Sequence, residues 1–244
     1  MKTVMPYVTG GVSAGWADHV RAFADAGADL VEVGLPFSEP TLDGATIQEA
    51  TATALRRGAT LDTVLASAPR GIVPLVASTY ANLACRPGFC ARLADAGFTG
   101  LIVPDLPLEE CAGLSAEAEA AGIDLALLAA PVTPDARLAE IGRRSRGFVY
   151  AVSVMGTTGE RDTLSPAAAD LAARLKARTE LPVLLGFGIS TPEQAAEAAR
   201  VADGVVIGAA IMRRLLDGAG PAELGAYVGT LRKAVDSTDG TDGG

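Results

Sequence analysis

The sequence predicts an α/β fold, a single (β/α)8 TIM barrel, on three observations. Short apolar runs rich in β-branched residues alternate strictly with alanine-rich segments of helical period along the whole chain. The chain has 244 residues, close to the roughly 250 that one such barrel needs. An Ala-Gly step ends a helix just before a strand at Gly27, Gly97 and Gly122, as helix C-caps do. Eight such units would close a parallel sheet on itself.

The expected strands read as near-continuous apolar runs, which is typical of strands buried on both faces. They cover 4–9, 29–34, 72–77, 100–103, 124–128, 147–153, 183–186 and 204–207. Helices are expected over 16–26, 47–57, 61–68, 88–96, 108–121, 134–143, 166–178, 191–200 and 222–235, with a short one from Ala209. The barrel domain then spans 1–236, and the polar, glycine-rich segment 237–244 is expected to be a disordered tail.

Composition limits the class of function. A net charge of −9 argues against nucleic acid or an anionic membrane as the main partner. No apolar run reaches the roughly 18 residues of a membrane span, and the N-terminus lacks a signal-peptide core, so a cytoplasmic location is expected. The three cysteines are expected to be reduced and structural. The one histidine, His19, is expected at a helix surface or edge and cannot build a metal site alone.

The second strand carries a charge where none is expected. Glu32 is the only ionisable residue among the apolar positions of 30–35. A buried carboxylate is costly unless it is paired or neutralised, and chemistry is one reason to keep one. A buried ion pair with Lys or Arg is the alternative. We therefore take Glu32 as a candidate acid/base residue.

A second carboxylate, Asp43, lies on the loop that follows the same strand. In such barrels the active site is built from the loops after the strands. Two carboxylates in different environments suit paired acid/base and electrostatic roles, and a loop position nearer water would keep Asp43 ionised. The alternative for Asp43 is a plain Asp-Gly turn.

Glycines follow the sixth, seventh and eighth predicted strands. Gly159, Gly188 and Gly208 would let backbone N–H groups approach an anion, and a helix from Ala209 would add its N-terminal partial charge. Barrels frequently hold a phosphate at this place, although tight strand-to-helix turns alone would also explain the glycines. An apolar side chain such as Phe187 would suit one wall of an aromatic pocket.

Taken together, these segments resemble the tryptophan synthase alpha chain family. The most specific match is LVEVGLPFSEP at 30–40, followed by Leu-Asp-Gly at 42–44 and Ile-Gln at 47–48. Further matches lie at 80–82, 103–107, 130–131, 156–159, 186–190 and 208–211, so the resemblance covers about 6–211. It implies a TIM-barrel lyase that splits indole-3-glycerol phosphate into indole and glyceraldehyde 3-phosphate without cofactor or metal.

The resemblance also implies roles for particular residues. Glu32 would move the proton at indole C3 and at the glycerol hydroxyls, and Asp43 would accept the indole N–H. Tyr150 would lie near the scissile bond, and Thr158 would hydrogen-bond the aspartate from a loop that closes over the substrate. The chemistry agrees, because cleavage needs a protonated C3 and a glutamate with a raised pKa can hold that proton near neutral pH.

Several positions depart from the family pattern. Glu39 replaces the usual aspartate that faces the beta chain, and Ala209 replaces a serine beside the last phosphate glycine. The segment 10–13 replaces Gly-Asp-Pro, and the helix that usually caps the barrel floor is missing from the start of the chain. The resemblance implies an αββα heterotetramer with a beta chain, and we expect Glu39 and the missing N-terminal helix to weaken it.

Three other functions stay open. The chain could be a stand-alone lyase that releases free indole, or a weakly active subunit that mainly activates a beta chain. A third alternative is another phosphate-binding barrel, such as an isomerase of phosphoribosyl intermediates. Those barrels often use aspartates at the ends of strands one and five, where this sequence has Thr9 and Ala129.

Overall fold

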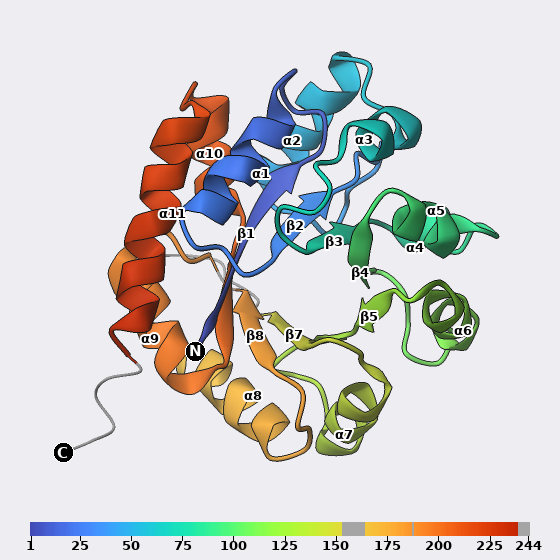
Figure 1. Cartoon of the computed structure of the whole chain (residues 1–244). Helices are drawn as coiled ribbons and strands as arrows, with labels where there is room; N and C mark the ends of the chain where they lie inside the picture. Colours follow the sequence, from blue (N-terminus) through green and yellow to red (C-terminus); the bar gives the residue numbers. More distant parts are fainter. Residues whose placement is uncertain (153–163, 187, 239–244) are drawn as a thin grey trace.

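The computed structural model describes residues 1–152, 164–186 and 188–238 of the chain. Its strands form one parallel sheet in the order β5-β4-β3-β2-β1-β9-β8-β7-β6, and the helices surround it (Figure 1). The predicted TIM barrel is confirmed. None of the helices in these ranges is long and apolar enough to cross a bilayer.

The strands run in the following order along the chain. They are β1 (Thr3–Thr9), β2 (Val31–Gly34), β3 (Leu75–Ser78), β4 (Phe98–Ile102), β5 (Asp124–Ala126), β6 (Leu128–Ala129), β7 (Val149–Val152), β8 (Val183–Gly186) and β9 (Gly204–Ile207). The helices are α1 (Trp16–Asp25), α2 (Ala45–Arg56), α3 (Leu61–Ser67), α4 (Ala81–Ala84), α5 (Phe89–Asp95), α6 (Ala112–Ala121), α7 (Asp135–Arg144), α8 (Pro166–Lys176), α9 (Pro192–Val201), α10 (Ala209–Leu216) and α11 (Pro221–Asp236).

The fifth predicted strand is divided in two, and the division closes the barrel. Among the described strands, β5 pairs only with β4, and β6 pairs only with β7, with Leu127 between them. The Leu127 N–H bonds the Ser145 hydroxyl at 3.2 Å, and its carbonyl accepts from the Tyr150 N–H at 3.0 Å. The two edges of the sheet are therefore consecutive parts of one chain segment, and eight strand positions complete the ring.

The barrel interior is filled by side chains from rows that run around the sheet. Met5, Leu184 and Val206 pack there with Val76, each at most 4% exposed. Side chains at paired positions of parallel strands point to the same face. Glu32 pairs with Val76 on one side and with Tyr7 on the other, so all three face the interior.

Some boundaries differ from those expected. The third strand begins at Leu75 rather than at residue 72, because Pro74 precedes it and Ile72 is 40% exposed. It continues to Ser78, which the apolar pattern alone did not include. His19 was expected at a surface or edge position, which is wrong, because only 5% of the residue is exposed on the inner face of α1. Burial lowers the pKa of its imidazole.

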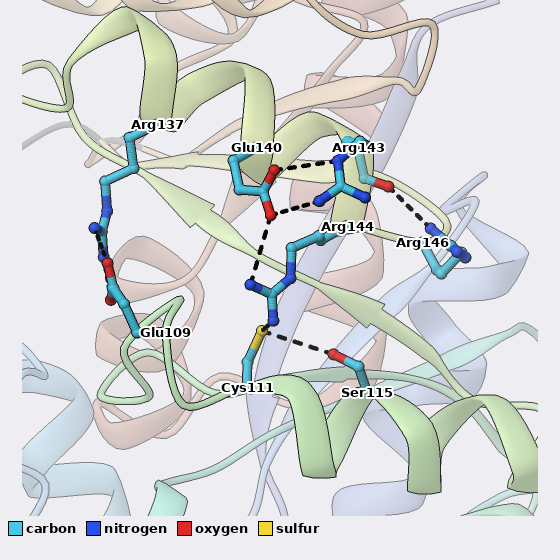
Figure 2. Close-up of polar contacts among 8 residues, drawn as sticks. All are labelled: Glu109, Cys111, Ser115, Arg137, Glu140, Arg143, Arg144 and Arg146. Carbon is cyan, nitrogen blue, oxygen red and sulfur yellow. Dashed lines mark hydrogen bonds and ion pairs between the residues drawn. The ribbon is translucent and has the colours of Figure 1, made fainter.

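Polar contacts join α6 and α7 beside the divided strand. Figure 2 shows Arg144 of α7 reaching Cys111, at the start of α6, where its Nη2 donates to the sulfur at 2.8 Å. Arg144 also pairs with Glu140 at 3.7 Å, and Arg137 bonds Glu109 of the preceding loop. All three cysteines are free thiols; Cys90 and Cys111 are buried, as expected of structural residues, whereas Cys85 is exposed.

Candidate active site

Two cavities lie at opposite ends of the barrel interior. One is at the carboxyl ends of the first strands, and its lining includes Tyr7, Gly34, Asp43, Ser78 and Tyr80. The other lies at the amino ends, and Asp124 is the only titratable side chain among the described residues that line it. Active sites of such barrels lie at the carboxyl ends of the strands, so the first cavity is the candidate active site.

Glu32 lies two residues before Gly34 on β2, so both face the barrel interior. It is 6% exposed, and burial raises the pKa of its carboxyl from 4.5 to about 7. The Ser78 hydroxyl opposes this rise, and the charge of Asp43 adds to it. No ion pair to Glu32 occurs within the described ranges, so the alternative of a buried ion pair is not seen there. A carboxyl poised near pH 7 can both give and take a proton.

Asp43 is held by an aromatic residue from the next strand end. The Tyr80 hydroxyl donates to Asp43 Oδ2 at 2.9 Å and accepts from the Leu42 N–H at 3.1 Å. The Tyr80 ring stacks on Phe37 with centroids 5.0 Å apart. Asp43 is half-buried, and burial raises the pKa of its carboxyl while the Tyr80 bond lowers it. Asp43 is thus less exposed to water than expected, and its hydrogen bond to Tyr80 is not explained by an Asp-Gly turn alone.

Tyr150, the third candidate catalytic residue, lies on β7 across the barrel from this loop. Its phenol oxygen lies close to Gly186 of β8, where an added Cβ would approach it to 2.7 Å. Burial raises the pKa of Tyr150 well above its usual value, and the charge of Glu32 adds to the rise. Tyr150 is therefore a neutral hydroxyl near Glu32.

The expected anion-binding turns are described in part. Gly208 is the N-cap of α10, and Ala209 is its first residue, as the sequence predicted. Gly188 has a positive φ of 47°, a conformation that favours glycine. The Gly208 carbonyl accepts from the Ile211 and Met212 N–H groups. The first N–H groups of an α-helix have no partner within the helix, so those of α10 suit an anionic ligand. Thr158, Gly159 and Phe187 lie outside the described residues.

The described ranges show no candidate metal site, and they leave room for a ligand at Gly208. They contain no cluster of three or more His, Cys, Asp or Glu side chains placed to hold a metal ion. An added Cβ at Gly208 would only make ordinary contacts, at 3.7 Å to the Tyr7 Cβ and 3.9 Å to the Ile47 Cδ1. Packing within the protein therefore does not require glycine at position 208. A ligand that approaches the backbone closely would explain the glycine.

Sequence reasoning missed three residues of this cavity. Tyr80 was noted only within the family match at 80–82, with no role assigned to it, and Ser78 and Tyr7 were not considered at all. The signal for Tyr80 was its place two residues after the end of β3, in the loop that leads to α4. Tyr7 and Ser78 could have been found from parity, because each lies an even number of residues from another inward-facing position of its strand.

The chain is similar to known proteins over nearly its whole length. The family model described as tryptophan synthase alpha chain matches residues 1–229. A tryptophan synthase alpha chain from Synechococcus sp. is 44% identical, over 90% of this chain and 86% of the relative. One from Streptomyces coelicolor is 42% identical, over 98% of this chain and 88% of the relative.

Solved structures agree with the sequence relatives. A structure of tryptophan synthase from Mycobacterium tuberculosis superposes with a TM-score of 0.86 at 37% identity, covering 96% of this chain and 92% of that one. The tryptophan synthase alpha subunit of Legionella pneumophila superposes with a TM-score of 0.85 at 31% identity, covering 97% and 93%.

Proposed function

Because the chain belongs to the tryptophan synthase alpha chain family, and so serves as a lyase subunit in tryptophan biosynthesis, we propose the reaction that it catalyses. The substrate is indole-3-glycerol phosphate, and the products are indole and glyceraldehyde 3-phosphate. The observation that carries this proposal is Glu32, a buried carboxyl without a cationic partner in the described ranges and with a pKa of about 7. Such a group suits a reaction that needs a proton delivered and another removed at neutral pH.

In the proposed reaction Glu32 moves protons and Asp43 stabilises charge. Glu32 protonates indole C3, which makes the ring cationic. Asp43 accepts the ring N–H and stabilises that cation. The hydroxyl on the carbon attached to C3 then loses its proton to Glu32, the carbon–carbon bond breaks, and its electron pair restores the indole. The former hydroxyl becomes the aldehyde oxygen of glyceraldehyde 3-phosphate.

The remaining residues bind and orient the substrate in this proposal. Tyr150 gives a neutral hydroxyl near the breaking bond. Gly188, Gly208 and the Ala209 N–H receive the phosphate at the start of α10, together with Gly159. Thr158 bonds the indole-side aspartate, and Phe187 contacts the ring.

Direct measurement of both products tests the reaction. Purified chain is incubated with indole-3-glycerol phosphate, and indole and glyceraldehyde 3-phosphate are quantified. We expect equal amounts of the two, and a rate at least tenfold lower for Asp43→Asn, because the neutral amide stabilises a cation less well. No indole from the wild type, alone or with a beta chain, would refute the proposal.

We also propose a beta chain as partner, in an αββα assembly. Leu42, next to Asp43 on the loop after β2, is 61% exposed, and Val132, on the loop after β6, is 87% exposed, so both lie at the carboxyl end of the barrel. In this proposal the beta chain covers these two apolar side chains. Leu42→Asp and Val132→Asp should each weaken co-elution with the beta chain, whereas Ile72→Asp, at the other end, should not.

Mixing the chain with a beta chain also distinguishes the alternative functions. If Glu39 and the replaced segment 10–13 abolish the interface, the beta chain will neither co-elute nor raise the rate of indole formation. The chain would then be a stand-alone lyase. If the beta chain is activated although no indole forms, the chain is chiefly an activating subunit. The cytosolic location expected from the sequence stays a prediction.

A further inference from the structure

Tyr7 and Thr9 form a hydroxyl pair at the mouth of the barrel that the proposed reaction has not used. The Tyr7 Oη and the Thr9 Oγ1 are 3.1 Å apart, and both residues lie on β1. Tyr7 is the register partner of Glu32 on β2. Its hydroxyl reaches over Gly34, and an added Cβ there would lie 1.9 Å from the phenol oxygen. The phenol therefore borders the same cavity as Asp43 and Ser78.

The number of protons in this pair determines which hydroxyl donates the hydrogen bond. Each hydroxyl has one proton, and a single hydrogen bond between them uses only one of the two. Thr9 is 0% exposed, and Tyr7 is the one described partner of its hydroxyl. If Tyr7 donated to Thr9, the Thr9 proton would be buried without an acceptor, which is costly.

With Thr9 as the donor, the buried Thr9 proton has an acceptor. If Thr9 donates to Tyr7, the remaining proton is on the phenol of Tyr7, a residue that lines the cavity and can donate to a ligand there. Burial raises the pKa of Tyr7 far above its usual value, with smaller contributions from Asp43 and Glu32, so this proton stays on the oxygen at neutral pH. Tyr7 is thus a neutral donor aimed into the site.

We propose that Tyr7 binds substrate by donating this proton to an oxygen of the glycerol chain, and that Thr9 is the positioning residue that directs it. The inference rests on the proposed function. The indole ring offers an N–H donor and no acceptor oxygen, so it cannot receive the proton. The phosphate is assigned to the turns at Gly188 and Gly208. The glycerol hydroxyls that exchange protons with Glu32 remain, and Tyr7 is the neighbour of Glu32 on the sheet.

Two ligands separate this hydrogen bond from simple packing. Glu32→Gln is used as the background so that bound substrate is not consumed. Affinity is measured by calorimetry for indole-3-glycerol phosphate and for indole-3-propyl phosphate, which keeps the ring and phosphate but lacks the glycerol hydroxyls. Adding Tyr7→Phe should weaken binding of the first about three- to tenfold, the range of one neutral hydrogen bond, and change the second less than about twofold.

Thr9→Val tests the direction of the pair independently. Valine keeps the shape and removes the hydroxyl, so the Tyr7 hydroxyl loses the donor that orients it, and substrate binding should weaken about twofold. Tighter binding would mean that Tyr7 gives its proton to Thr9 in the wild type, which would overturn the inference. Tyr227→Phe, which removes a hydroxyl from outer helix α11, is the control and should leave the ratio of the two affinities unchanged.

The outcomes distinguish this inference from the proposed function. Equal weakening of both ligands by Tyr7→Phe, or no weakening of either, would refute the role of Tyr7 while wild-type cleavage still supports the lyase. Failure of the wild type to bind or cleave indole-3-glycerol phosphate would refute the proposed function itself.

Discussion

The hydroxyl of Tyr80 donates a 2.9 Å hydrogen bond to Oδ2 of Asp43, which joins the end of β3 to the loop that follows β2. The same hydroxyl accepts from the Leu42 N–H, so it fixes both the side chain and the backbone of that loop. Burial raises the pKa of Tyr80 to about 12, which keeps it a donor at every working pH. The position of one candidate catalytic carboxylate thus depends on a neighbouring strand.

Removal of this hydroxyl should lower activity more than stability. In Tyr80→Phe the ring still stacks on Phe37, but Asp43 loses its donor and the Leu42 N–H loses its acceptor. We expect kcat/KM for the lyase reaction to fall about five- to twentyfold, as one lost hydrogen bond to a charged group allows. Tyr80→Leu also removes the stacking and should cost more. Equal, near-wild-type rates for both variants would contradict this account.

Gly34 is predicted to be needed because the Tyr7 phenol occupies the place of its side chain. The added Cβ of Gly34→Ala would lie 1.9 Å from the Tyr7 oxygen and 2.6 Å from its ring, so Tyr7 must move. We expect a loss of about 1–3 kcal/mol in the free energy of unfolding, measured with urea. Gly113→Ala, on α6, where nothing lies within 4 Å of the added Cβ, is the control and should be neutral or slightly stabilising. Pairing Gly34→Ala with Tyr7→Leu should restore part of the loss.

The raised pKa of Glu32 should make stability depend on pH. Its carboxyl titrates near 4.5 when unfolded and at about 7 when folded, so the folded state binds the proton more tightly. Stability from this group is present below pH 4.5, falls as the pH rises to about 7, and is constant above. Glu32→Gln removes this dependence. We expect the difference in unfolding free energy, variant minus wild type, to increase by on the order of 3 kcal/mol between pH 4.5 and pH 8. An equal difference at pH 5 and pH 8 would show that Glu32 titrates normally.

Arg232 is expected to secure the last helix to the floor of the barrel. It is 9% exposed, and its guanidinium bonds Asp29 Oδ2 at 2.9 Å, the Lys2 carbonyl at 2.8 Å and Asp236. Arg232→Met keeps the bulk but leaves Asp29 without its cation, so we expect a loss of about 2–3 kcal/mol in urea unfolding. Arg213→Met breaks the exposed pairs with Glu49 and Asp217 and should cost less than about 1 kcal/mol. Similar losses for the two variants would contradict the role of burial.

The fold could be predicted from the sequence because local patterns repeat through it. Apolar runs and Ala-Gly caps place the strands and most helices within a few residues. The division of the fifth strand could not be predicted, because it depends on a hydrogen bond from Leu127 to Ser145, 18 residues later. The burial of His19 was missed because its helix face is decided by packing against neighbouring elements rather than by residue type.

The candidate site could be predicted only where a single residue conflicts with its surroundings. Glu32 is a charge within an apolar run, which a reader of the sequence can see. Tyr80 is ordinary in its own segment, and its role comes from a hydrogen bond across 37 positions to Asp43. Parity places Tyr7 and Thr9 on the same face of β1, but it could not predict their hydrogen bond, since alternating polar and apolar positions also occur on strands with a solvent-facing side.

The central claim is that the Glu32 carboxyl transfers the proton that breaks the carbon–carbon bond. The most direct measurement is single-turnover indole formation from indole-3-glycerol phosphate by Glu32→Gln and the wild type, with the affinity of each for indole-3-propyl phosphate. Glutamine keeps the shape and cannot exchange the proton, so the rate should fall by about 10²–10⁴ while the affinity changes less than a few-fold. A rate within tenfold of the wild type at unchanged affinity would show that another group moves the proton, and would contradict the account.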